Sequence, residues 1–190
     1  IGDILRELKA LGLERDTIVM FTSDNGPDFS DSGEGPKVRF NCGFNGAKGN
    51  VYEGGIRVPM LVRWPADLDG GREVHDMVHF CDWFPTLLAA AGVEVPPALN
   101  IDGVNVLPVL RGDGVDVPSR RFWQWNRYEP VVSSNAAMRD GDWKLVRPVI
   151  KETMNIDARA REMDGAQRRE PWKPFEPDRS PFPRREVPPP

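Results

Sequence analysis

The chain has 190 residues, which is enough for one sizeable core or for one domain with an appendage. Its formal net charge of -4 gives no electrostatic reason to expect a nucleic-acid partner. Its 2 cysteines are too few for a disulfide framework, and they leave the redox compartment open. There is no run of about 18 apolar residues, so we expect no membrane span.

The chain opens on "IGDILRELKALGL", which lacks an initiator Met and already follows an amphipathic pattern. Ile1, Leu5, Leu8 and Leu11 recur at helical spacing, and Gly12 stands where a left-handed helix cap is favoured. No signal peptide precedes this predicted helix. We therefore expect a fragment of a longer protein, in which case the missing leader says nothing about localisation.

The next segment, "TIVMF" (17–21), predicts a strand that is covered on both faces, as in a parallel α/β sheet, because its residues do not alternate. Ligands gather at the carboxyl ends of such strands, which is where Asp24 and Asn25 stand. A hard cation such as Ca²⁺ takes carboxylate and amide oxygens, and Gly26 permits the sharp turn that both ligands need. The alternative is an Asn-Gly hairpin turn, but "PDFSDSGEGP" is a poor partner strand.

Residues 27–50 predict a long loop rich in Gly, Asn, Asp and Ser. A loop of this length is usually either functional or disordered, and its many polar side chains beside a strand end favour function. Within it, Lys48 lies between Gly46 and Gly49, so an anion could approach its ammonium group closely. Lysine is a compact charge that suits a tetrahedral oxyanion. The alternative is an ordinary solvated surface lysine.

A second strand is predicted at "VPMLVRW" (58–64). Just before it, Glu53 and Arg57 lie four residues apart, and we expect a structural ion pair that braces the turn. "FCDWFPTLLAAAGV" (80–93) predicts a helix, since proline is tolerated in a first turn and Gly92 follows the apolar stripe.

Three β-like segments then predict a small antiparallel sheet with a turn at Asp140–Gly141: 121–128, 135–140 and 142–150. Its tryptophans could line a sugar subsite, but we expect them to pack within the sheet. From Lys151 onward prolines become dense, and we expect this tail to be extended or disordered in isolation.

Several of these segments resemble one family in their order along the chain. "TIVMFTSDNG" and "GAKGNVYEGGIRVPMLVRWP" resemble the second half of the type I sulfatases, within the alkaline-phosphatase-like superfamily. "DWFPTLLAAAGV", "IDGVNVLPVLRG" and "AAMRDGDWKLV" match further segments, so the resemblance covers about residues 1–150. The first two motifs are specific, because several unusual residues recur at fixed spacing.

The resemblance implies an α/β fold, namely the C-terminal part of an alkaline-phosphatase-like α/β sandwich followed by a small antiparallel β subdomain. We accordingly expect three parts, the last of them truncated: catalytic domain 1–115, β subdomain 116–150 and Pro-rich tail 151–190.

The resemblance also implies roles for three residues. Asp24 and Asn25 match the family's Ca²⁺ ligands, and Lys48 matches the lysine that contacts the sulfate ester and serves catalysis. Related two-metal phosphatases place a His after the Asp, which suits Zn²⁺. Asn25 therefore favours a single Ca²⁺ and the sulfatase branch.

We expect the family's nucleophile to lie in a missing N-terminal part. Sulfatases convert the Cys or Ser of C/S-x-P-S-R to formylglycine, whose hydrate attacks sulfur. The similar "DVPSR" begins with Asp116, which cannot become an aldehyde, and neither Cys42 nor Cys81 has the required context. His75 and His79 could share a helical face, but no third ligand is apparent nearby, so we do not expect them to bind a metal.

The sequence therefore predicts a segment of a sulfuric ester hydrolase that is inactive without the rest of the protein. Two alternatives stay open: a phosphate or phosphonate ester hydrolase of the same superfamily, and a noncatalytic binder of sulfated glycans. The expected partner is a sulfate ester, with sulfated carbohydrates as one candidate class. The family is often periplasmic, secreted or lysosomal, and the sequence defines neither the compartment nor the oligomeric state.

Overall fold

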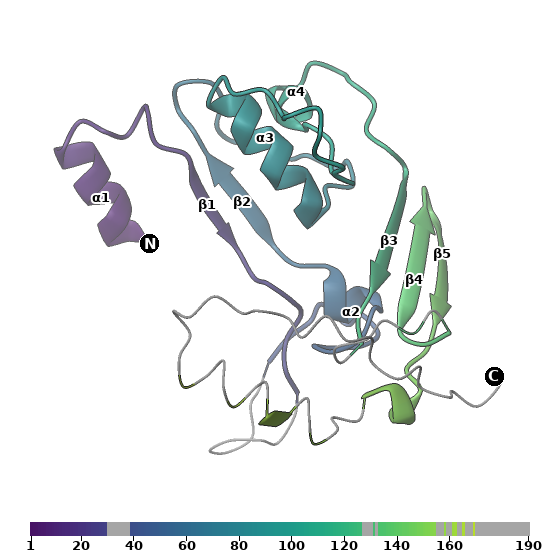
Figure 1. The fold of residues 1–190 in the computed structure, drawn as a ribbon. Coiled ribbons are helices and arrows are strands. Elements are labelled where there is room, and N and C mark those ends of the chain that lie inside the picture. The colour runs from purple at the N-terminus through teal and green to yellow at the C-terminus, as the bar shows by residue number, and fades with distance from the viewer. Residues whose placement is uncertain are drawn as a thin grey trace. The chain divides into compact units, whose positions relative to one another are not determined.

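The computed structural model describes residues 1–29, 39–126, 131 and 133–154, together with positions 158, 161, 162, 165 and 169. The chain forms two compact units (Figure 1). Unit 1 contains Ile1–Asp24 and Val58–Arg121, and unit 2 contains Asn25–Arg57 and Phe122–Pro190. No helix in the described part is long and apolar enough to cross a membrane. Beyond the 3-10 turn η2 (Lys151–Met154), the predicted tail lies almost entirely outside the described residues.

Unit 1 begins with the predicted helix and strand. Helix α1 (Gly2–Ala10) is followed by Gly12 in the left-handed region at φ +69°, as the sequence predicts. Strand β1 (Val19–Thr22) pairs with β2 (Met60–Arg63), the second predicted strand. The two strands lie side by side in Figure 1.

The direction of this pairing differs from the prediction. β1 and β2 are antiparallel, with Thr22 opposite Met60. The cross-strand partners Phe21 and Leu61 are 47% and 59% exposed, so burial on both faces is also wrong for the described residues. A continuous apolar run is typical of a parallel strand buried on both faces, but it does not determine the direction of the neighbouring strand.

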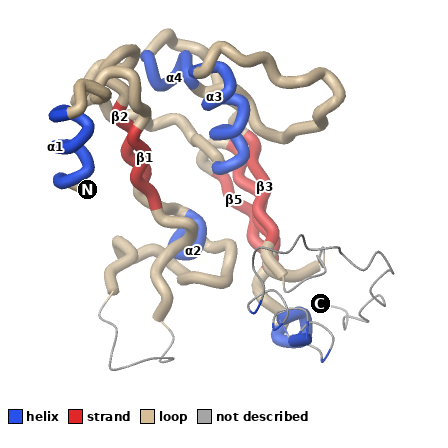
Figure 2. Tube along the Cα trace, turned by 60° about the vertical axis from the view of Figure 1, so that its left-hand side comes forward, coloured by secondary structure: helices blue, strands red, loops and turns tan. Residues whose placement is uncertain are grey.

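Two further helices of unit 1 follow β2. The predicted helix at 80–93 is confirmed as a 3-10 turn, η1 (Phe80–Asp82), that continues into α3 (Trp83–Ala90). A second helix, α4 (Leu107–Arg111), contacts α3 (Figure 2) and was not predicted. Its segment supplies three buried apolar side chains of this unit: Val106, Leu107 and Val109.

Unit 2 holds a short helix, α2 (Glu53–Ile56), and most of a three-stranded sheet. The strand order is β3-β4-β5, from strands β3 (Arg120–Gln124), β4 (Ala136–Asp140) and β5 (Trp143–Arg147). β4 and β5 are antiparallel and joined at Gly141, which has φ +56°. The predicted sheet and its turn are therefore confirmed for the described residues, and positions 127 and 128 of its first predicted strand lie outside them. The expectation that the tryptophans pack within the sheet is wrong for Trp143, which is 84% exposed, because β5 alternates between its faces and Trp143 lies on the outer one.

Candidate functional site

The end of β1 leads directly into the predicted metal ligands. Asp24 is exposed and ends the first stretch of unit 1, and Asn25 is half-buried and begins unit 2. Gly26 N donates to Gly55 O at 2.9 Å, and a Cβ on Gly26 would lie 1.8 Å from Gly54 O. The Asn-Gly pair is therefore not a hairpin turn. Its glycine allows the backbone to approach α2, and β1 pairs with β2, which begins at Met60.

Lys48 lies in a tight turn formed by Ala47–Asn50. Asn50 N donates to Ala47 O at 3.2 Å, and Gly49 has φ +91°, as in turns that favour glycine at the third position. Lys48 N donates to Pro27 O at 3.0 Å. The structure thus brings the turn that carries Lys48 against the segment that follows Asn25.

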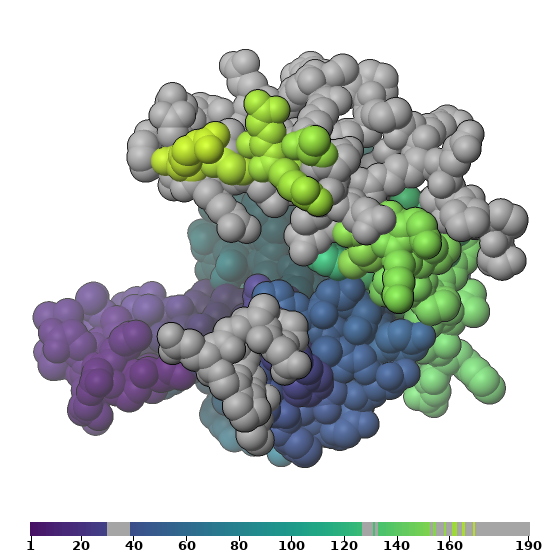
Figure 3. Space-filling model, turned by 90° about the horizontal axis from the view of Figure 1, so that it is seen from below, coloured from purple at the N-terminus to yellow at the C-terminus, as the bar shows by residue number. Residues whose placement is uncertain are grey.

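The Lys48 side chain is 56% exposed, and its Nζ lies 3.8 Å from Asp28 Oδ2. In Figure 3 the stretch around residues 39–57, drawn in blue, reaches the surface of the face shown. The sequence had indicated an open approach for an anion but not the neighbouring carboxylate. At this exposure the pair is weak, so an anionic ester could compete with Asp28 for the ammonium group.

The donor atoms at positions 24 and 25 fit a hard cation. Asp24 offers carboxylate oxygens and makes no hydrogen bond or ion pair within the described part of the chain, and Asn25 offers an amide oxygen. Ca²⁺ takes six to eight oxygen ligands at typical sites, roughly three times what these two residues provide. Across the described residues, no group of three or more His, Cys, Asp or Glu could hold a metal by itself.

The predicted ion pair between Glu53 and Arg57 is confirmed at 3.8 Å. The closest partner of Glu53 is Lys144 on β5, whose Nζ donates at 2.6 Å, and Arg139 lies 3.9 Å away on β4. Lys144 Nζ also lies 5.7 Å from the centroid of the Trp123 ring. Sequence reasoning missed the contact between Glu53 and Lys144 because it joins positions 91 residues apart.

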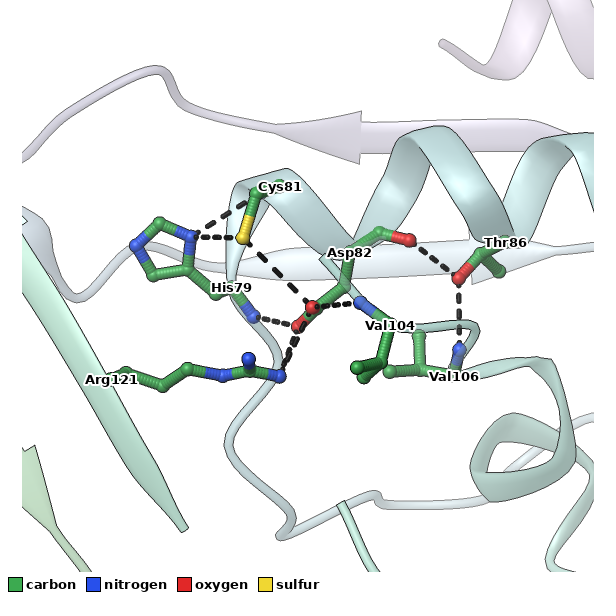
Figure 4. Close-up of polar contacts among 7 residues, drawn as sticks. All are labelled: His79, Cys81, Asp82, Thr86, Val104, Val106 and Arg121. Atoms are coloured by element: carbon green, nitrogen blue, oxygen red, sulfur yellow. Dashed lines mark hydrogen bonds and ion pairs between the residues drawn. The ribbon is translucent and has the colours of Figure 1, made fainter. Parts of the chain in front are cut away.

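Unit 1 has its own buried polar cluster (Figure 4). The Asp82 carboxylate is fully buried and accepts hydrogen bonds from His79 N at 2.8 Å and Val104 N at 2.9 Å. Arg121 Nη2 donates to both of its oxygens at 3.0 and 2.9 Å. The cluster joins the start of α3, the loop before α4 and the start of β3, which is a structural role.

This cluster also places Cys81 Sγ 3.1 Å from His79 Nδ1, an arrangement that resembles a nucleophile with its base. Burial raises the pKa of the Cys81 thiol, and the Asp82 carboxylate raises it further. The thiol form is therefore favoured, which opposes nucleophilic chemistry. His79 lies at the start of η1 and His75 in the loop before it, so the two do not share a helical face.

Comparison with known proteins identifies relatives in one family. The family model described as Sulfatase matches residues 1–93. Steryl-sulfatase of Mus musculus is 46% identical over 104 residues, which cover 54% of this chain and 17% of that protein. Arylsulfatase A of Homo sapiens is 38% identical over 97 residues, covering 50% of this chain and 18% of that protein. The matched part thus spans less than a fifth of these relatives.

Solved structures extend the similarity over more of the chain. Ps i-CgsB in complex with k-i-k-neocarrahexaose is similar with a TM-score of 0.65 and 25% identity, covering 90% of this chain and 39% of that one. BT4656 in complex with its substrate D-glucosamine-2-N,6-O-disulfate has a TM-score of 0.54 and 29% identity, covering 76% and 28%. These neighbours confirm the predicted α/β fold of alkaline-phosphatase-like type.

Proposed function

Since residues 1–93 match its family model, the chain belongs to the sulfatase family, and we propose that the complete protein hydrolyses sulfate esters. In this proposal Lys48 contacts the ester and serves catalysis, and Asp24 and Asn25 supply two of the ligands of a Ca²⁺ ion. The substrate class that we favour is a sulfated carbohydrate, because two of the similar solved structures hold a neocarrahexaose and a glucosamine disulfate.

The observation that carries the proposal is the hydrogen bond between Lys48 N and Pro27 O. Pro27 lies two residues after Asn25, so a short stretch of backbone connects the candidate cation ligand to the candidate anion contact. A sulfate ester that bridges a hard cation and an ammonium group needs these two charges near each other.

The proposed chemistry breaks the bond between sulfur and the ester oxygen after a nucleophile attacks sulfur. Negative charge develops on the sulfate and leaving-group oxygens, and the Lys48 ammonium stabilises it. A bound Ca²⁺ would supply Lewis-acid stabilisation of the same charge. The chain lacks C/S-x-P-S-R, so we propose that the nucleophile lies elsewhere in the protein and that residues 1–190 alone do not turn over an aryl sulfate.

The test compares Lys48→Ala with Lys9→Ala in the complete protein, because Lys9 is an exposed lysine of α1. Removing one group that stabilises charge in a transition state typically costs about 10²–10³-fold in kcat. We expect a loss of this size for Lys48→Ala with an aryl sulfate and no loss for Lys9→Ala. Unchanged activity of Lys48→Ala would remove the proposed role.

The same assay separates the alternatives. Faster hydrolysis of the matched aryl phosphate than of the aryl sulfate would favour a phosphate or phosphonate ester hydrolase. No turnover of either ester, together with binding of a sulfated oligosaccharide, would favour the noncatalytic glycan binder.

A further inference from the structure

Asn135 connects the small sheet of unit 2 to the turn that carries Lys48. It directly precedes β4, is 1% exposed, and has φ +46°, in the left-handed region where asparagine is enriched. Its backbone is fixed on both sides, because its N donates to Pro148 O at 3.1 Å and its O accepts from Trp125 N at 3.1 Å. The side chain therefore projects from a rigid point of the sheet.

The Asn135 side chain uses both ends of its amide. Nδ2 donates to Gly49 O at 2.9 Å and to Trp125 O at 2.7 Å, and Oδ1 accepts from Val51 N at 3.1 Å. Gly49 is the residue after Lys48, and Val51 is 2% exposed. One buried side chain thus fixes the main chain immediately after Lys48, while the bond from Lys48 N to Pro27 O fixes it on the other side.

We propose that Asn135 is a positioning residue that sets the location of the Lys48 ammonium group, an inference that rests on the function proposed above for Lys48. Val51 N and the carbonyl oxygens of Gly49 and Trp125 would lose a partner if this amide were removed, so the turn would have to move to find others. A displacement of about 1 Å in a catalytic group can cost on the order of 10²-fold in rate. Asn135 does not touch the ester and acts through Lys48.

The test is a double-mutant cycle in the complete protein with Asn135→Gly, Lys48→Ala and the pair, measured as kcat/KM on an aryl sulfate. Glycine accepts φ +46°, so the variant removes the side-chain bonds without adding backbone strain. We expect Asn135→Gly to lose about 10–100-fold through kcat. Once Lys48 is absent its position no longer matters, so the double variant should equal Lys48→Ala within about 3-fold.

The inference would be overturned if the loss of kcat/KM in the double variant equalled the product of the losses in the two single variants. An Asn135→Gly enzyme with normal kcat would overturn it as well. Full activity of Lys48→Ala would instead overturn the proposed function, so the two failures are distinguishable. Ser134→Ala is the matched control, since Ser134 is buried in the same turn and its Oγ accepts from Ile150 N at 2.9 Å. We expect it to lower the unfolding midpoint while kcat stays within about 2-fold.

If Asn135→Gly does not fold, the same double-mutant cycle with Lys48→Ala is measured with Asn135→Asp instead. Aspartate has the same size, tolerates positive φ, and keeps an acceptor for Val51 N. It replaces the donor to Gly49 O with an oxygen, so we expect Asn135→Asp to lose kcat to the same extent as Asn135→Gly. In the Lys48→Ala background, Asn135→Asp should cause no further loss. A folded Asn135→Asp enzyme with normal kcat would overturn the inference.

Discussion

Cys81 has the neighbours of a catalytic cysteine in surroundings that oppose catalysis. His79 Nδ1 lies 3.1 Å from its sulfur, yet burial and the Asp82 carboxylate both raise the thiol pKa, against a smaller opposing effect of Arg121. A raised pKa means that less thiolate is present at any pH below it. Cys81 should therefore behave as a structural residue of low reactivity.

We predict that iodoacetamide modifies Cys42 before Cys81 at pH 7.5. Cys42 is exposed and Cys81 is half-buried, and the raised pKa of Cys81 further lowers the fraction of reactive thiolate. The rate at Cys81 should keep rising as the pH increases through the alkaline range, because deprotonation is delayed. Peptide mass spectrometry over time measures both rates. Equal or faster labelling of Cys81 at pH 7.5 would show that the thiol is activated.

At the scale of elements, the contact between the segment at 25–28 and α2 is possible because Gly26 has no side chain. A Cβ on Gly26 would lie 1.8 Å from Gly54 O and 2.8 Å from Gly54 C, and both of these are backbone atoms that cannot rotate away. Gly26→Ala must therefore separate the two segments and break the bond from Gly26 N to Gly55 O.

We predict that Gly26→Ala destabilises the complete protein by at least about 2 kcal/mol, within the range of overpacked sites, and lowers kcat as well. Gly70→Ala is the matched control, because a Cβ there meets nothing within 4 Å and its φ is not positive. Urea unfolding midpoints and kcat on an aryl sulfate measure both effects. If the two variants have equal midpoints, the close approach at Gly26 is not a constraint on this sequence.

The elements that the sequence predicts correctly are those whose signals are local. The helix at 80–93, both early strands and the small sheet each follow from an apolar pattern bounded by Gly, Pro or Asp. Helix α4 was missed although Pro108 stands in its first turn and Gly112 ends it at φ +90°. Five residues are too few for helical periodicity to be visible, so only these end signals could have identified it.

The residues of the candidate site also divide into those with a local sequence signal and those identified only by contacts in the fold. Lys48 could be selected from the sequence because a glycine precedes it closely and another follows it. The structure agrees with that signal, since Gly46 and Gly49 both adopt positive φ. Asn135 could not be selected in this way, because the two atoms that it binds near Lys48 lie 84 and 86 residues earlier. An asparagine before a strand has many ordinary explanations, and only the fold identifies its partners.

At the scale of the whole molecule, the proposed calcium site should be visible in thermal stability. A ligand that binds only the folded protein stabilises it by about 2.7 kcal/mol when its concentration is 100 times its Kd. In the function proposed above, Asp24 supplies a carboxylate ligand to this site. Its replacement should weaken calcium binding more than the loss of a neutral ligand would, since ligand charge sets much of the affinity for Ca²⁺.

We predict that Ca²⁺ raises the Tm of the complete protein and that Asp24→Asn abolishes most of this rise. Asp69→Asn, which changes an exposed loop carboxylate of the same unit, should keep the full rise. Mg²⁺ at equal ionic strength controls for screening, because it demands a tighter octahedral geometry and should stabilise less. Differential scanning calorimetry measures all three proteins without reference to activity. A rise that is equal in Asp24→Asn and Asp69→Asn would remove Asp24 from the proposed ligands, whatever the fate of Lys48.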